Sequence, residues 1–164
     1  MIRPASIRPA TPDDAAMIAR VHVTAWGETY GGLLLPEDIL AQTEPARRAF
    51  WARALREGAS RVAVAPDAGF ASMGPQRDAD LAARWPEEVY AVYVLRAAHG
   101  RGLGRALLRA VWGREAATAL VVEGNPACAF YEAVGARHVD TRDETIGASP
   151  VRERVYAWEA GAGP

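Results

Sequence analysis

Three glycines alternate with other residues in "HGRGLGRALL", at Gly100, Gly102 and Gly104, between an apolar run and a helical pattern. Main-chain N–H groups at the start of a helix are unpaired and carry the positive end of its dipole, so they bind anions. Glycine lets a phosphate reach the backbone without meeting a side chain. Arg101 and Arg105 add positive charge. The stretch predicts a pyrophosphate cradle, with a plain glycine-rich turn as the alternative that the spacing leaves open.

Two other phosphate loops do not fit the residues. A Rossmann loop needs G-x-G-x-x-G, and the third position after Gly104 is Leu107. This loop also follows the third predicted strand instead of opening the first βαβ unit. A Walker-type loop needs a lysine, and all nineteen basic residues of the chain are arginine. Lysine Schiff-base chemistry is excluded for the same reason.

The remaining composition narrows the function classes. His22, His99, His138 and Cys128 lie far apart and share no metal-ligand spacing, so we expect no metal. One cysteine allows no internal disulfide. The arginines are scattered among acidic residues at a net charge of −1, which speaks against nucleic acid as a partner. No apolar run reaches the ~20 residues of a membrane span, and no signal peptide is visible. We therefore expect a cytoplasmic protein.

The elements that must position these residues form one α/β domain over residues 1–164. Thr11 and Pro12 open a helix with Trp26 on its buried face, and a second helix covers residues 44–57 with Phe50, Trp51, Ala54 and Leu55 inward. The strongest strand is "EVYAVYVL", rich in β-branched and aromatic residues. The other predicted segments are strands at 61–65, 68–74 and 119–124, helices at 103–117 and 126–135, and a final antiparallel strand pair at 136–144 and 152–160.

The glycine stretch resembles the acyl-CoA pyrophosphate loop of the GNAT superfamily of N-acetyltransferases, Q/R-x-x-G-x-G/A. Gly102 and Gly104 match, and His99 stands at the Gln/Arg position. The first helix with its following loop, the strand "EEVYAVYVL" and the segment "GNPACAFYEAVGARH" are similar to further parts of the family, in the right order. The resemblance implies a mixed, mostly antiparallel sheet of six to seven strands, about four flanking helices, and a homodimer.

For the cosubstrate, the resemblance implies acetyl-CoA. The main chain of the strong strand would hold the pantetheine amides as a peptide edge would. Asn125 is a weaker candidate contact, because it precedes Tyr131 by six residues where the family has seven, and it also suits a helix N-cap. The implied cofactor residues are Val92, Tyr93, Val94, His99, Gly100, Arg101, Gly102, Leu103, Gly104, Arg105 and Asn125.

For the reaction, the resemblance implies direct attack of a primary amine, of a small molecule or peptide, on the thioester. A main-chain N–H near Val94 would stabilise the oxyanion, and Tyr131 would protonate the leaving thiolate. Glu88 is either the general base or a solvated charge at a strand end. The acceptor pocket would involve Trp26, Glu28 and Tyr30, for which helix packing is the other interpretation. The alternative function is a non-catalytic acyl-CoA-binding module.

Overall fold

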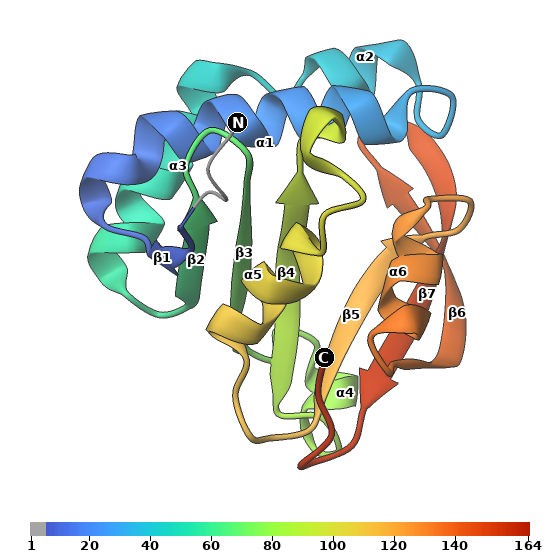
Figure 1. Cartoon of the computed structure of the whole chain (residues 1–164). Coiled ribbons are helices and arrows are strands. Elements are labelled where there is room, and N and C mark those ends of the chain that lie inside the picture. Colours follow the sequence, from blue (N-terminus) through green and yellow to red (C-terminus); the bar gives the residue numbers. More distant parts are fainter. Residues whose placement is uncertain (1–5) are drawn as a thin grey trace.

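The computed structural model describes residues 6–164, so the first five residues of the expected domain lie outside it. Its strands form one sheet in the order β1-β2-β3-β4-β5-β7-β6 (Figure 1). Neighbouring strands are antiparallel, except for β4 and β5, which run parallel. The strands are β1 (Arg8–Pro9), β2 (Arg61–Ala65), β3 (Gly69–Pro75), β4 (Glu87–Val94), β5 (Ala117–Val122), β6 (Arg137–Ile146) and β7 (Ser149–Trp158).

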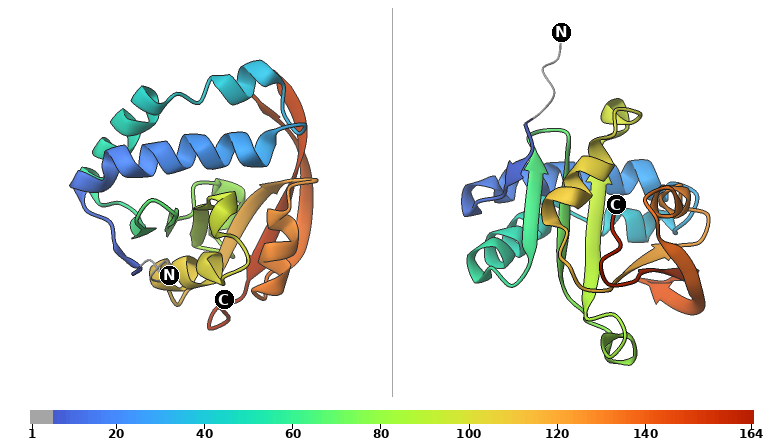
Figure 2. Two further views of the ribbon diagram at one scale, coloured as in Figure 1. Left: turned by 45° about the horizontal axis from the view of Figure 1, so that its top comes forward. Right: turned by 60° about the horizontal axis from the view of Figure 1, so that its bottom comes forward.

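Helices cover both faces of this sheet (Figure 2). On one face α5 and α6 pack over a core that includes Leu107, Leu108 and Trp158. On the other, α1 and α3 cover β2 and β3, and α4 lies against the far part of β5 and β7; we call this the acceptor face. Within residues 6–164, no helix has the length and apolarity to cross a membrane. The helices are α1 (Ala15–Tyr30), α2 (Pro36–Leu40), α3 (Glu44–Glu57), α4 (Ala79–Ala82), α5 (Leu103–Val111) and α6 (Ala127–Ala133).

The start of the first helical segment and the end of α3 lie at the predicted residues, Thr11 and Gly58. A short 3-10 turn, Pro12–Asp14, precedes α1, and the Asp14 carboxylate accepts the Thr11 main-chain N–H at 2.8 Å. Gly58 ends α3 in the left-handed region, with φ 63°. The prediction that Phe50 points inward is wrong: its side chain is 42 % exposed, whereas Trp51 is 3 % exposed. One residue turns a helix by about 100°, so the side chain next to the buried Trp51 faces solvent.

The parallel strands β4 and β5 stay together only at their beginnings. They pair from Glu87 opposite Ala117 to Val89 opposite Ala119, and then diverge (Figure 1). On its other side β4 stays paired with β3, but the register shifts so that Tyr90 is an extra residue between Val89 and Ala91. Such a bulge bends its strand and increases the local twist. The second half of β4 therefore has no neighbour on its β5 side.

Several short elements differ from the sequence-based prediction. The predicted set lacks β1, α2 and α4, which comprise two, five and four residues. Elements this short carry too little periodicity to be recognised. The helix predicted to reach Ala117 ends at Val111, whose carbonyl accepts a hydrogen bond from the Arg61 guanidinium at 2.7 Å. A side chain satisfies the last turn there, so the chain is free to leave the helix.

Candidate active site

A cleft of about 720 Å³ opens where β4 and β5 diverge. It brings together the second half of β4, the loop from His99 to Arg105 that enters α5 (the phosphate loop), and the start of α6. Of the residues predicted to bind a cofactor, Arg101 alone is not in its lining. The lining residues are Glu28, Thr29, Val92, Tyr93, Val94, Arg96, Ala98, His99, Gly100, Gly102, Leu103, Gly104, Arg105, Asn125, Pro126, Ala127, Phe130, Ala133 and Val134.

The backbone conformation or the close packing at each glycine of the phosphate loop disfavours a side chain. Gly100 and Gly102 have φ 76° and 71°, a region that side chains disfavour, and a Cβ on either would meet no atom within 4 Å. Gly102 is the N-cap of α5. A Cβ on Gly104 would lie 3.2 Å from the Phe130 ring. The loop thus leaves the helix start open toward the cleft, a geometry in which main-chain N–H groups receive an anion.

His99, the departure from the family pattern, closes the turn between β4 and the phosphate loop. Its Nε2 lies 2.8 Å from the Val94 carbonyl oxygen. A carbonyl only accepts hydrogen bonds, so this nitrogen carries the proton. The ring therefore ties the end of the strand to the start of the loop, which are the two parts of the cleft that lie next to each other.

Tyr131 lies on α6 beside the cleft, next to the lining residue Phe130. Its side chain is 6 % exposed and packs against Tyr156 and Trp158. Burial raises the pKa of its hydroxyl well above the usual value, and the nearby Tyr30 hydroxyl adds to this. The phenol is therefore protonated at neutral pH, as a proton donor has to be.

Asn125 precedes the N-cap of α6, which is Pro126 and not Asn125 as predicted, but its side chain still receives the first N–H of the helix. Its Oδ1 accepts the Ala127 main-chain N–H at 2.8 Å, and its side chain is buried. Gly124 before it has φ 90°, which only glycine adopts easily. The Tyr30 hydroxyl lies close to both Asn125 and Tyr93: burial raises the pKa of Tyr30, and these two neighbours oppose the rise.

The three predicted acceptor residues occupy the end of α1, on the acceptor face. The Glu28 carboxylate accepts the Arg96 main-chain N–H at 2.8 Å, and the Arg96 guanidinium donates to the Glu28 carbonyl at 2.8 Å. The Trp26 and Tyr30 rings are in contact, with centroids 4.2 Å apart and planes tilted by 43°. Among the described residues, the buried Nε1 of Trp26 has no hydrogen-bond partner. Glu28 thus lines the cleft, while the two aromatic residues stand behind it.

Glu88 also faces the acceptor side, but it is enclosed. Its residue is 2 % exposed, and its carboxylate accepts three hydrogen bonds from Arg77: from the main-chain N–H at 3.2 Å, from Nε at 3.1 Å and from Nη2 at 2.6 Å. The Arg77 guanidinium lies 4.1 Å from the centre of the Tyr90 ring. Both oxygens of Glu88 are therefore engaged by Arg77, a residue that no sequence motif singles out.

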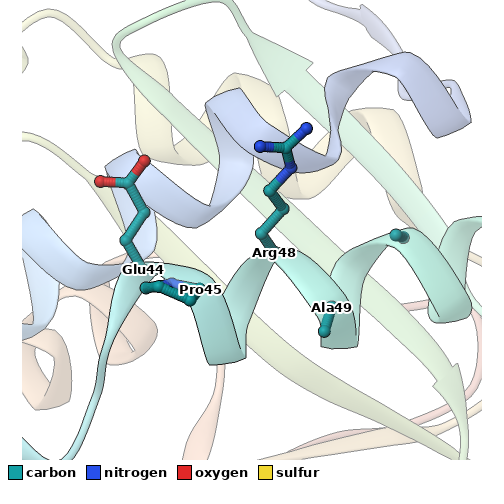
Figure 3. A pocket seen from close by; sticks show the side chains of 5 residues that line it. Glu44, Pro45, Arg48 and Ala49 are labelled. Carbon is teal, nitrogen blue, oxygen red and sulfur yellow. The ribbon is translucent and has the colours of Figure 1, made fainter.

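Figure 3 shows a second hollow, of about 550 Å³, on the outer side of the fold. All its lining residues come from α3: Glu44, Pro45, Arg48, Ala49 and Ala52. Glu44 and Arg48 are one turn apart and project from the same side of the helix (Figure 3). Among residues 6–164 no second element brings a polar group to this hollow, so it offers no convergent site.

Comparisons with known proteins agree with this geometry. Residues 48–135 match the family model of the Acetyltransferase (GNAT) domain. The uncharacterised N-acetyltransferase YuaI of Bacillus subtilis is 30 % identical over 93 % of this chain and 92 % of its own. A GCN5-related N-acetyltransferase from Rhodopseudomonas palustris superposes with a TM-score of 0.71, 20 % identity and 98 % coverage of both chains. The structure of yncA from Salmonella typhimurium with its cofactor acetyl-CoA superposes with a TM-score of 0.69. It is 21 % identical, and the match covers 94 % of this chain and 92 % of that one. The chain belongs to the GNAT family of acetyltransferases.

Proposed function

We propose that this protein is an acetyl-CoA-dependent N-acetyltransferase that acts on a primary amine. One observation carries the proposal: a single cleft joins the unpaired side of Val92–Val94 to the open, glycine-lined start of α5. An edge of main-chain groups next to an anion site suits a ligand with amides at one end and phosphates at the other. Acetyl-CoA has this form.

In this arrangement the phosphate loop holds the pyrophosphate and β4 holds the pantetheine arm. Arg101 and Arg105 lie in the loop at the rim of the anion site; Arg105 also donates to the Ala133 carbonyl at 2.8 Å. The thioester then lies toward the bulge at Tyr90, near the first halves of β4 and β5. Among the described residues no group of histidine, cysteine, aspartate and glutamate could hold a metal ion, so the proposal assigns none.

The chemistry is a direct transfer. The amine nitrogen attacks the thioester carbonyl and the C–S bond breaks, with a main-chain N–H of β4 stabilising the oxyanion. Because the thioester lies toward the bulge at Tyr90, this N–H belongs near the bulge and not near Val94. Tyr131, which burial keeps protonated, gives its proton to the CoA thiolate. The acceptor enters past Trp26, Glu28 and Tyr30. Glu88 borders this path, and it would have to leave Arg77 before it could accept a proton.

The test is turnover. The purified protein is offered acetyl-CoA with a panel of primary amines, and free thiol is measured. We expect amine-dependent thiol release with at least one member of the panel. Saturable acetyl-CoA binding without thiol release from any amine would favour the non-catalytic binding module instead.

Two further proposals rest on other grounds. A homodimer follows from the resemblance, and sedimentation equilibrium measures it directly. A cytoplasmic location follows from the composition, and fractionation of the source cells tests it.

A further inference from the structure

Glu153 interrupts an apolar row on β7. Alternate residues of a strand share a face, and Val151, Glu153 and Val155 alternate. Val151 packs with Tyr30 and Val122 near the end of α1, and Val155 packs with Leu81 near α4. Glu153 therefore lies on the acceptor face, between the apolar cluster beside α1 and the one beside α4. A carboxylate between two such clusters is unusual, because its desolvation is unfavourable.

Glu153 is half-buried, and within residues 6–164 it forms no ion pair. Its pKa is raised by burial first, then by the carboxylates of Glu144 and Glu88, while Arg142 and Arg77 oppose the rise. Both arginines are engaged elsewhere: Arg142 with Asp78 and Asp140, and Arg77 with Glu88. Glu153 is thus a carboxylate with free oxygens, unlike Glu88.

The position of Glu153 relates it to the proposed chemistry. It pairs with Val122, the last residue of β5, three residues beyond Ala119, where the pairing of β5 with β4 ends. Its charge raises the pKa of Tyr30, after the effect of burial, and Tyr30 in turn raises the pKa of Tyr131. On the same face Val151, two residues before Glu153, shares an apolar cluster with Tyr30, against which the cleft residue Tyr93 packs.

We propose that Glu153, and not the enclosed Glu88, receives the acceptor's ammonium group and takes a proton from it. The inference rests on the proposed function. The acceptor R–NH₃⁺ gives one proton to the Glu153 carboxylate, and the nitrogen lone pair forms the C–N bond. The C–S bond breaks, the thiolate takes the Tyr131 proton, and the second nitrogen proton restores the Tyr131 hydroxyl. Glu153 returns its proton to water.

A general base at Glu153 implies that the acceptor amine binds in its protonated form. A base is needed only where the amine arrives protonated, as alkylamines with a pKa of ~10 do at neutral pH. A carboxylate with a raised pKa is better matched to this task than an ordinary one, and it still holds the cation before transfer. The acceptor is therefore a protonated primary alkylamine, whether free or at the end of a side chain.

The experiment is a pH profile of kcat/KM for an alkylamine that the wild type acetylates, for wild type, Glu153→Gln, Glu153→Asp, Glu88→Gln and Asp143→Asn. Asp143 is the matched control, because it lies on the neighbouring strand with its side chain 95 % exposed. We expect Glu153→Gln to lose about 100-fold or more, as removal of a general base does. The kcat/KM that remains in Glu153→Gln should rise tenfold per pH unit. Only the unprotonated amine can react in this variant, and its fraction rises tenfold per pH unit below the pKa of the amine.

Glu153→Asp should keep the wild-type shape of the profile at a lower rate, and Asp143→Asn should match the wild type. Glu88→Gln should be slower, because Arg77 loses its partner. Its kcat/KM should still fall at low pH as that of the wild type does, where the general base becomes protonated (the acidic limb of the profile). A Glu153→Gln profile parallel to that of the wild type, or loss of the acidic limb in Glu88→Gln, would overturn the inference alone. A wild type that acetylates no amine would overturn the proposed function and this inference with it. Acetyl-CoA binding by calorimetry checks that each variant is folded.

Discussion

In the proposed mechanism the leaving-group step depends on Tyr131. Tyr131→Phe keeps the ring that packs on Trp158 and removes only the hydroxyl. We expect kcat to fall by about 100-fold or more, because the thiolate would leave without its acid, while the KM for acetyl-CoA changes little. Steady-state thiol release measures both constants. Tyr156→Phe is the control: it removes another buried hydroxyl, which bonds to Glu132 at 2.9 Å outside the cleft. Equal loss in both variants would contradict the role of Tyr131.

We propose that His99 supports the binding of acetyl-CoA through its hydrogen bond to the Val94 carbonyl. His99→Ala removes the 2.8 Å hydrogen bond that ties the strand to the phosphate loop. A net hydrogen bond of about 1 kcal/mol corresponds to a rise of roughly fivefold in the KM for acetyl-CoA. His99→Gln retains a donor and should stay near the wild-type value. If the KM for acetyl-CoA rose as much in His99→Gln as in His99→Ala, the hydrogen bond to Val94 would not be the contribution of His99.

At the scale of elements, α2 and the β6–β7 hairpin are joined by one carboxylate. Asp38 accepts the Ala148 main-chain N–H at 3.1 Å and the Ser149 hydroxyl, and Ser149 Oγ accepts the Leu35 N–H at 2.8 Å. Both segments border the acceptor face, on which Val151 and Tyr30 meet. This connection fixes the distance between the loop after α1 and the strand that carries Glu153.

Gly147→Ala should separate these two segments. A Cβ there would lie 1.9 Å from Asp38 Oδ1, so α2 has to move. We expect a higher KM for the amine and an unchanged KM for acetyl-CoA. Gly58→Ala is the matched control, with φ 63° against 61° but open space around the Cβ. Both variants should lose stability, about 1 kcal/mol for the left-handed backbone alone. A raised amine KM in the Gly58 variant would show that lost stability, and not the contact, is responsible.

The sequence predicted the long elements and the phosphate loop, because strand alternation, helix caps and glycine spacing are local signals. It also predicted residues that the structure gathers in one cleft, since β4, the phosphate loop and the start of α6 follow one another along the chain. The acceptor side was harder. The Arg77 side chain contacts Glu88 across the connection between β3 and β4. Asp38 and Ser149 form a hydrogen bond although 111 residues separate them in the sequence. Glu153 carries a partial signal, as the charged residue between Val151 and Val155, but only the structure shows that it is half-buried and, within residues 6–164, forms no ion pair.

At the scale of the whole molecule, His22 links folding to pH. It is buried under α3, where the Trp51 Nε1–H donates to its Nδ1 at 3.1 Å and the Tyr93 ring stacks on it at 5.0 Å. Burial, aided by the charge of Arg47, lowers the pKa of His22 to about 3. The unfolded chain binds this proton near pH 6.5, so between these two values the unfolded state holds more protons. Stability should therefore fall as pH falls through this window.

The loss attributable to His22 is on the order of 3 kcal/mol by pH 4. Urea unfolding at pH 7 and pH 4 measures it, against His22→Gln, which keeps an acceptor for Trp51 but does not titrate. We expect the glutamine variant to be less stable at pH 7 and to lose less on acidification. Parallel losses in the two proteins would show that His22 is not the group responsible.

The central claim for the molecule is that the phosphate loop receives the pyrophosphate of acetyl-CoA. Gly100 allows a direct test, because its φ of 76° tolerates Asn and Asp best and its surroundings are open. Gly100→Asn and Gly100→Asp have the same shape and differ by one negative charge. In calorimetric titrations with acetyl-CoA at low salt, we predict that the aspartate variant binds at least about tenfold more weakly than the asparagine variant, and that salt narrows the gap. Equal affinity of the two variants, or no binding of acetyl-CoA by the wild type, would contradict the account.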